Sequence, residues 1–398
     1  MPPIAPFSAS RAAAVLPPPS EQDRLLSRRL VERIVAEIRQ AGGALPFDRF
    51  MELALYAPGL GYYTGGRRKF GEAGDFVTAP EVSPLFARCL ARQCRQVLDA
   101  LVAVDVLEFG AGSGVLAADL LAELERLDSL PERYLILELS AELKRRQRNT
   151  LAQRVPHLLD RVAWLERLPD AGFRGMVLAN ELLDAMPVHR FRLQHGVCLE
   201  QLVVQRGDGL ALCWESPVSA GLETAVALLP EVPDDYESEL NLRATPWIQA
   251  LAERIEAGLV LLIDYGYPRA EYYHPQRDRG TLMCHYRHRA HPDPLFHPGL
   301  QDITSHVEFT SLAAAAQTSG LSVCGYSTQA FFLMGCGLEQ LLSASDPDDI
   351  QMHMELAQGI KKLTLPSEMG ERFKVLGLCR GLEQAPVGFS VRDMRERL

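Results

Sequence analysis

The stretch VDVLEFGAGSGVL, residues 104–116, decides the fold. Its apolar part, residues 104–109, predicts a short buried strand, and the three glycines that follow predict a tight turn into a helix. The first turn of such a helix offers backbone N–H groups that have no partner within the helix. Because ligands of doubly wound sheets bind at the carboxyl ends of the strands, this turn predicts a binding site.

More apolar runs of strand length follow, and helical stretches separate most of them. They cover residues 134–139, 162–165, 176–179 and 259–264. Strands that alternate with helices predict crossover units and a parallel sheet covered on both faces, so the fold class is α/β with a doubly wound, Rossmann-like core. Gly-rich breaks between shorter runs at 189–215 predict an antiparallel β insertion.

The sequence pattern divides the chain into four regions. Residues 1–20, rich in Pro, Ala and Ser, predict a disordered tail. Residues 21–101 predict a helical region with a long loop at 59–84, and such loops in compact proteins are usually functional. The core spans 102–330 with the β insertion at 188–216, and residues 331–398 predict a helical C-terminal region.

Composition excludes several classes of protein. The 398 residues are 47% hydrophobic and carry a formal net charge of -10, which opposes binding to the phosphates of nucleic acid. No apolar run reaches the roughly 18 to 20 residues that span a bilayer, so we expect no membrane association. The 8 scattered cysteines favour a reducing compartment. Since residues 1–20 lack the pattern of a secretory signal, we expect a bacterial cytoplasmic protein, with the mitochondrial matrix as the alternative.

The order of residues in the glycine turn indicates the ligand. Glu108 precedes Gly110, Gly112 and Gly114, whereas Val115 stands where the dinucleotide fingerprint has its last glycine. An acid directly before the turn would repel a pyrophosphate but attract the cationic sulfonium and amino group of S-adenosyl-L-methionine. We therefore predict this methyl donor as the cofactor. A structural turn in an unrelated α/β enzyme is the alternative.

Polar residues end two further strands at the same edge. Glu138 closes the second strand, where an acid can accept both ribose hydroxyls of a nucleoside, although it could instead cap the next helix. Asn180, Glu181 and Asp184 follow the fourth strand, and we place Asn180 on the donor side. If the acceptor is a guanidinium, Glu181 is the leading clamp and Asp184 the second, since carboxylates bind it bidentately. Their alternative role is turn formation and helix capping.

The segment CHYRHRAH, residues 284–291, raises the question of a metal site. Its histidines have i, i+3, i+6 spacing, but the prolines at 292, 294 and 298 oppose the helical turn that such ligands would need. We predict no metal and interpret the segment as a polar loop at the active site, with His288 on the acceptor side. The sequence motifs of serine hydrolases, zinc proteases and P-loop nucleotide hydrolases do not occur.

Several blocks of the chain resemble the MidA-like family of class I S-adenosylmethionine-dependent methyltransferases. The most specific are GDFVTAPEVSP at 74–84 and ANELLDAMPV at 179–188. The other matching blocks are MELALYAPGLGYY at 51–63, IDYGY at 263–267, QDITSHVEF at 301–309, and residues 108–114, 138–140 with Gln147, and 280–288. The resemblance implies a seven-stranded methyltransferase core with the 74–84 loop folded over the donor. It adds Asp75, Thr78 and Glu81 to the donor site.

The leading hypothesis is a class I methyltransferase that acts on a protein arginine. The mitochondrial members of the family are arginine methyltransferases needed for assembly of respiratory complex I, so the resemblance implies a protein substrate, with a complex I subunit as one candidate. A small-molecule or RNA methyltransferase and a donor-binding assembly factor are the alternatives, and the acidic charge gives RNA no support. A homodimer is compatible with the surfaces expected around 189–215 and in the C-terminal helices.

Overall fold

The computed structural model describes residues 16–65, 78–102, 104–344 and 349–398. The chain forms two compact units, which are described separately. Unit 1 comprises Met1–Phe76, Ala185–Leu242 and Tyr273–Ser305, and unit 2 comprises Val77–Asp184, Arg243–Tyr272 and His306–Leu398. Both units therefore draw on distant parts of the sequence.

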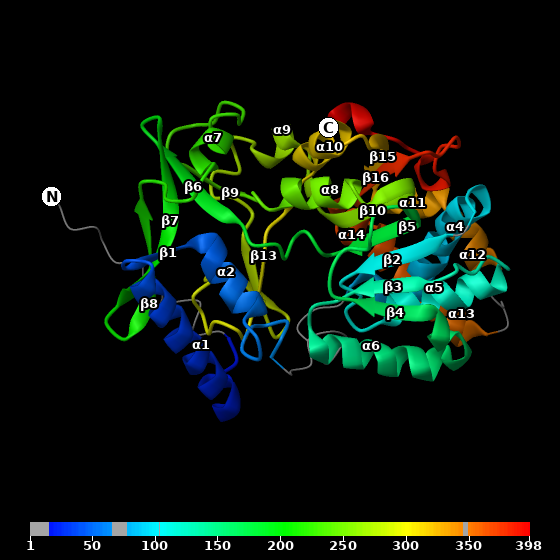
Figure 1. The fold of residues 1–398 in the computed structure, drawn as a ribbon, viewed down its shortest axis with the longest axis horizontal. Coiled ribbons are helices and arrows are strands. Elements are labelled where there is room, and N and C mark those ends of the chain that lie inside the picture. Colours follow the sequence, from blue (N-terminus) through cyan, green and yellow to red (C-terminus); the bar gives the residue numbers. More distant parts are fainter. Residues whose placement is uncertain (1–15, 66–77, 103, 345–348) are drawn as a thin grey trace. The chain divides into compact units, whose positions relative to one another are not determined.

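Unit 2 contains the sheet that the sequence predicted, and the α/β fold class is confirmed (Figure 1). Its strand order is β15-β16-β10-β5-β2-β3-β4, with β14 beside β10. The strands β4, β3, β2, β5 and β10 are parallel neighbours, as crossover units require. The strands of unit 2 are β2 (Asp105–Phe109), β3 (Tyr134–Leu137), β4 (Val162–Leu165), β5 (Phe173–Asn180), β10 (Ile255–Tyr267), β14 (Val307–Glu308), β15 (Ser322–Thr328) and β16 (Phe373–Arg380).

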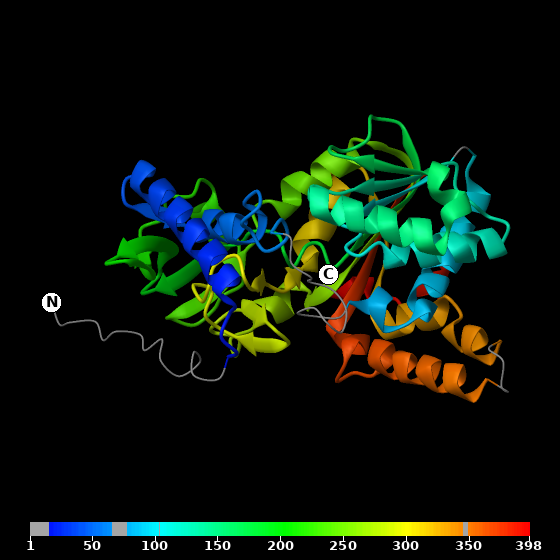
Figure 2. The same cartoon turned by 90° about the horizontal axis from the view of Figure 1, so that it is seen from below.

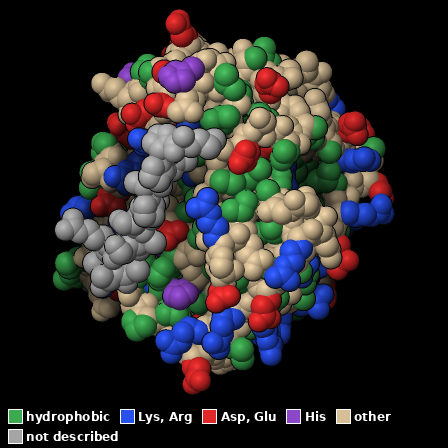
Figure 3. Space-filling model, turned by 90° about the vertical axis from the view of Figure 1, so that its left-hand side faces the viewer, with side chains coloured by type: hydrophobic (Ala, Val, Ile, Leu, Met, Phe, Trp, Pro, Cys, Tyr) green, Lys and Arg blue, Asp and Glu red, His purple; other side chains and the backbone are tan. Residues whose placement is uncertain are grey.

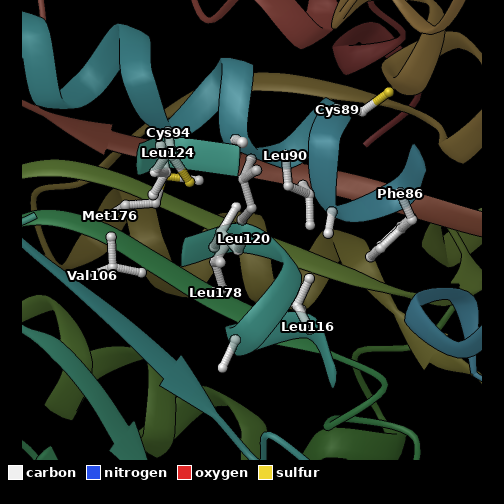
Figure 4. Close-up of a cluster of buried hydrophobic side chains, with 14 of the residues drawn as sticks. Phe86, Cys89, Leu90, Cys94, Val106, Leu116, Leu120, Leu124, Met176 and Leu178 are labelled. Atoms are coloured by element: carbon white, nitrogen blue, oxygen red, sulfur yellow. The ribbon is translucent and has the colours of Figure 1, made fainter. Parts of the chain in front are cut away.

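Helices cover both faces of this sheet. Val106 of β2 joins an apolar cluster with α4 and α5 on one face, where the leucines of α5 form an i, i+4 stripe (Figure 4). Phe109, an odd number of residues later, points to the other face and packs edge-on against Trp247 of α8. The helices of the first face are α4 (Pro84–Ala100), α5 (Val115–Arg126) and α6 (Ala141–Arg154), and α8 (Ala244–Ala252) contacts α10 (Phe309–Thr318) on the second. Figure 2 shows α6 along the outside of unit 2.

The sequence pattern predicts a helical C-terminal region at 331–398, but part of this region forms a strand. The region contains helices α12 (Leu338–Ser343), α13 (Ile350–Thr364) and α14 (Met369–Arg372), after α11 (Gln329–Gly335). However, residues 373–380 form β16, which lies antiparallel between β10 and β15. The segment is a strand because its apolar side chains, among them Val375, Leu376 and Leu378, are fully buried against both neighbours.

Unit 1 contains the expected antiparallel strands, and its sheet is larger than the predicted insertion. Its order is β1-β7-β6-β9, with β8 paired to β7, so residues before 188 and after 216 also contribute. The amphipathic helix α1 buries Leu30, Ile34 and Ile38, the i, i+4 stripe of its sequence. The elements are α1 (Glu21–Gln40), β1 (Ala44–Pro46), α2 (Phe47–Tyr56), β6 (His189–Gln194), β7 (Val197–Arg206), β8 (Gly209–Glu215), α7 (Leu222–Val226), β9 (Tyr236–Leu240), β11 (Met283–Tyr286), β12 (Arg289–His291) and β13 (Asp302–Thr304).

The described residues include neither a membrane-spanning helix nor a cluster of metal ligands. Within residues 16–65, 78–102, 104–344 and 349–398, no helix has the length and apolar character needed to cross a bilayer. The same ranges contain no group of three or more His, Cys, Asp or Glu side chains placed to hold a metal ion. On the face shown in Figure 3, Lys and Arg side chains are interspersed with Asp and Glu.

Candidate active site

The glycine turn follows β2 at the carboxyl edge of the sheet in unit 2. Gly110, Gly112 and Gly114 have φ of 61°, 51° and 80°, a left-handed backbone that other residues rarely adopt. Gly114 is also the N-cap of α5, and a Cβ on it would lie 2.9 Å from Cα of Gln147 in α6. The turn therefore needs glycine both for its conformation and for the close approach of α6.

Glu108 lies at the end of β2, and its side chain is buried. The hydroxyl of Tyr134 donates a hydrogen bond of 2.8 Å to Oε2 of Glu108. Burial raises the pKa of Glu108 to about 7, because the charged form loses its hydration. The carboxyl group is thus less strongly anionic near neutral pH than an exposed glutamate, which weakens the simple charge attraction that we inferred from its position. Its part in donor binding stays a prediction.

Glu138 follows β3, and two donors fix its carboxylate. Oε1 accepts a hydrogen bond of 2.8 Å from the backbone N–H of Ser140, and Oε2 accepts one of 2.9 Å from Nε2 of Gln147. Burial raises the pKa of Glu138, and these hydrogen bonds oppose the shift. The hydroxyl of Ser140 caps α6 by accepting from the N–H of Leu143, so Glu138 is not the helix cap that was its alternative role.

Gln147 was named only within the family resemblance, and the structure places it between the turn and Glu138. It is fully buried, and Nε2 also donates to the carbonyl oxygen of Gly112 at 3.3 Å. Its Oε1 accepts a hydrogen bond of 2.9 Å from Nε1 of Trp164, which lies in β4. The position could have been found from the helix pattern, because Leu143, Gln147 and Leu151 form the inward i, i+4 stripe of α6.

A residue with a left-handed backbone follows β5, the fourth predicted strand. Glu181 has φ of 50°, which is rare for a residue with a side chain and is most often maintained at functional sites. Its N–H donates to the carbonyl of Ile263 at 2.9 Å, and its Oε1 accepts from Nδ2 of Asn180 at 3.2 Å. Burial, together with the neighbouring carboxyl of Asp184, raises the pKa of Glu181 to about 8.

The segment that begins at Thr78 meets the same strand edge. The N–H of Ala79 in α3 (Ala79–Val82) donates to Oε1 of Glu181 at 3.2 Å, and Thr78 is the N-cap residue of α3. Oε2 of Glu81 is buried and has no hydrogen-bond partner among the described residues. Asp75 lies outside the described residues, so its place in the donor site stays a prediction.

A buried aspartate that our spacing analysis did not single out holds the turn after Glu181. Oδ2 of Asp264, in β10, accepts from the N–H groups of Leu183 at 2.9 Å and Asp184 at 3.2 Å. The hydroxyl of Tyr265 donates to Oδ2 of Asp184 at 2.5 Å. Burial and the adjacent carboxyl groups of Asp184 and Glu181 raise the pKa of Asp264. In the sequence Asp264 only ends an apolar run, which gives no hint of these contacts.

The two halves of the site lie at one edge of the sheet. β2 and β5 are parallel neighbours with Phe109 opposite Ala179, so the glycine turn and the segment from Asn180 leave the sheet side by side. A Cβ on Gly110 would lie 3.4 Å from Cδ1 of Leu182. His288, which the sequence predicts on the acceptor side, is not a residue of unit 2. It belongs to unit 1, where it is exposed in the turn between β11 and β12 with φ of 60°.

The residues at this edge fit the cofactor that the sequence predicted. The glycine turn presents backbone without side chains, as close approach of a ligand requires. Glu138 is held by two donors, and each of its oxygens retains capacity to accept from a ribose hydroxyl. The carboxyl groups of Glu181 and Asp184 after β5, together with Asp264 in β10, form a separate acidic group that would favour a cation.

Comparisons with known proteins show the family to which the chain belongs. Residues 89–327 match the model of a family described as "Putative S-adenosyl-L-methionine-dependent methyltransferase". The chain is 32% identical to the mitochondrial protein arginine methyltransferase NDUFAF7 homolog of Drosophila melanogaster, over 94% of this chain and 92% of that protein. It is 29% identical to protein arginine methyltransferase NDUFAF7 of Bos taurus, over 88% and 83%. The chain is also similar to a "likely methyl transferase" from Burkholderia thailandensis, whose crystal structure contains S-adenosyl-homocysteine. The two sequences are 43% identical, and the structures superpose with a TM-score of 0.92 over 96% of this chain and 100% of that chain.

Proposed function

Because the chain belongs to the MidA-like family of S-adenosyl-L-methionine-dependent methyltransferases, we propose that it methylates arginine side chains of a protein, with Glu181 as the principal acceptor clamp. The relatives from Drosophila melanogaster and Bos taurus are named protein arginine methyltransferases, which supports this acceptor. Methyl transfer needs a nucleophilic nitrogen aligned with the donor, so the task of the protein is to bind and orient both partners.

The observation that carries the proposal is the group of carboxyl side chains formed by Glu181 and Asp184, which follow β5, and Asp264, in β10. Burial and the neighbouring carboxyl of Asp184 raise the pKa of Glu181, and burial with the carboxyl groups of Asp184 and Glu181 raises the pKa of Asp264, because adjacent negative charges in a buried place are unfavourable. A guanidinium would relieve this repulsion and provide a planar set of N–H donors for two carboxylates. A neutral acceptor would leave the repulsion uncompensated.

The donor would be held at the adjacent part of the edge. S-adenosyl-L-methionine, when bound, supplies a methyl group on a cationic sulfonium. The glycine turn would lie against its amino acid portion and Glu138 would accept from its ribose hydroxyls. The residues assigned to the donor are Asp75, Thr78, Glu81, Glu108, Gly110, Gly112, Gly114, Glu138 and Asn180.

Glu181 and Asp184 have different parts in acceptor binding. Glu181 is held in place by the N–H of Ala79 and by Asn180, and Asp184 by the hydroxyl of Tyr265. Two fixed carboxylates can orient one guanidinium nitrogen. Because its pKa lies near neutrality, Glu181 is also suited to accept the proton that this nitrogen loses.

Separate assays of binding and transfer test the assignment of Glu181. We expect Glu181→Gln to bind S-adenosyl-homocysteine with wild-type affinity in calorimetry and to transfer little tritiated methyl from the donor to proteins of a cell lysate. The control is Glu253→Gln, the same change at an exposed position after α8, which should retain transfer. Unchanged transfer by Glu181→Gln would remove this residue from the mechanism. Donor binding by the wild type without any transfer would favour the assembly-factor hypothesis.

The partner and location of the protein stay predictions. The family resemblance supports a subunit of respiratory complex I as the acceptor. A bacterial cytoplasmic location is proposed from the sequence, and the mitochondrial relatives keep the mitochondrial matrix as the alternative. His288 is proposed on the acceptor side from the sequence alone. A homodimer is a further proposal, for which sedimentation of the purified chain is the direct measurement.

A further inference from the structure

Gln147 occupies a position where an apolar residue would be expected. It lies one turn from Leu143 and one turn from Leu151 on the buried stripe of α6, and its side chain is fully buried. A buried amide is costly unless its donors and its acceptor are satisfied. Here both ends of the amide have partners, and these partners come from three different strand ends or turns.

The partners of Gln147 define its position in the site. Nε2 donates to Oε2 of Glu138 at 2.9 Å and to the carbonyl oxygen of Gly112 at 3.3 Å, so one group joins the end of β3 to the glycine turn. Oε1 accepts from Nε1 of Trp164 at 2.9 Å, which fixes the orientation of the amide. The missing Cβ of Gly114 provides the space for the backbone of Gln147.

We infer that Gln147 is a positioning residue of the donor site, oriented by Trp164, which holds the Glu138 carboxylate and the glycine turn in the arrangement that receives the donor. The inference rests on the proposed role of Glu138 in donor binding. Gln147 does not touch the donor in this account. It acts through Glu138, whose carboxylate plane it fixes together with the N–H of Ser140.

The first test is the affinity for S-adenosyl-homocysteine, measured by calorimetry on the purified full chain. Gln147→Leu removes the hydrogen bond to a charged group, and such bonds correspond to an affinity loss of between about tenfold and about 100-fold. Gln153→Leu is the matched control, because Gln153 is exposed on the same helix and should bind like the wild type. Thermal unfolding of each variant shows that it is folded.

The second test separates positioning from general damage to the fold. Gln147→Glu keeps the shape of the side chain and the acceptor for Trp164 but replaces the donor to Glu138 with a carboxyl group. At pH 6 the two carboxyl groups can share a proton and restore the hydrogen bond, whereas at pH 8.5 both ionise and repel. The variant should therefore lose affinity as pH rises, whereas the wild type, in which an amide faces Glu138, should not show this loss. The other titratable neighbours of Glu138, Lys144 and Glu108, are the same in both proteins.

Trp164 provides a spectroscopic readout of the same contact. Its indole N–H donates to Gln147, so the Gln147→Leu protein should show altered Trp emission without ligand, and this change should be absent when Trp164→Phe is introduced as well. Wild-type affinity in Gln147→Leu, or a loss in Gln147→Glu that is equal at pH 6 and 8.5, would overturn the inference. If Glu138→Ala binds S-adenosyl-homocysteine like the wild type, the proposed donor role of Glu138 fails instead, and with it the reason for the inference.

Discussion

The ionisation of Glu181 should set the pH dependence of methyl transfer to a cationic acceptor. Its pKa is raised to about 8 by burial and by the carboxyl of Asp184. The guanidinium of arginine keeps its charge over the whole accessible range, because its pKa exceeds 12. A change of rate between pH 7 and 9 therefore reports the enzyme rather than the acceptor.

The size of the effect follows from this pKa. Near pH 7 about one tenth of the Glu181 side chains are ionised, and near pH 9 about nine tenths are. If only the ionised form binds and orients the acceptor, kcat/KM should rise by about tenfold across this interval. Asp184→Asn removes the neighbouring charge that raises the pKa of Glu181, so the midpoint of the profile should move to lower pH.

The assay is the initial rate of methyl transfer at saturating donor, with the acceptor that labelling identifies. The affinity for the donor is measured at each pH, so that saturation is maintained. Glu181→Gln should abolish the rise, because the amide does not titrate. A rate that is constant from pH 7 to 9 in the wild type, or a midpoint that Asp184→Asn leaves in place, would refute the role given to Glu181.

Three further predictions follow from single contacts. Gly114→Ala should lower the free energy of unfolding by about 2 to 5 kcal/mol, because the new side chain would sit on a left-handed backbone and clash with α6. Gly110→Ala would meet only a flexible leucine, so it should lower this free energy by about 1 to 2 kcal/mol. Equal losses in denaturant titrations would contradict this difference. Tyr265→Phe should reduce kcat/KM for the acceptor by about tenfold with unchanged donor affinity, because it loses the hydrogen bond to Asp184; weaker donor binding in calorimetry would argue against it. The ligand-free protein should lose stability as pH rises from about 5 to 8, because Glu181 keeps a proton in the folded state that it releases on unfolding. In unfolding titrations at several pH values, Glu181→Gln should flatten this dependence.

The sequence predicted the ligand edge of the sheet because the edge is a local feature. Each candidate acid follows an apolar run directly, and the ends of parallel strands meet at one edge whatever the rest of the chain does. Glu138 and Glu181 were found in this way, and Gly110 to Gly114 by their spacing. The α/β fold class followed from the same alternation of strands and helices.

The contacts that organise the site are non-local, and they could not be predicted from spacing. Asp264 reaches back to residues about 80 positions earlier, and the N–H of Ala79 reaches Glu181 102 positions later. The left-handed backbone of Glu181 is imposed by its surroundings, since its residue type does not favour it. The strand β16 was missed because an apolar run after helical segments has no local mark that it returns to the sheet.

Gln147 shows an intermediate case. Its position on the inward stripe of α6 is visible in the sequence, because apolar residues lie one turn before and one turn after it. A polar residue at such a position predicts a buried hydrogen-bond network, but the partners in the network are known only from the structure.

The central claim is that the protein transfers a methyl group to arginine in a protein, and identification of the labelled product tests it most directly. A lysate is incubated with the enzyme and tritiated S-adenosyl-L-methionine, the labelled macromolecule is isolated, and the modified atom is located by mass spectrometry, with Glu181→Gln as the control. Label on guanidinium nitrogens of a protein, absent with the variant, is the predicted result. Label confined to nucleic acid or to a small metabolite, or found on another side chain, would contradict the claim.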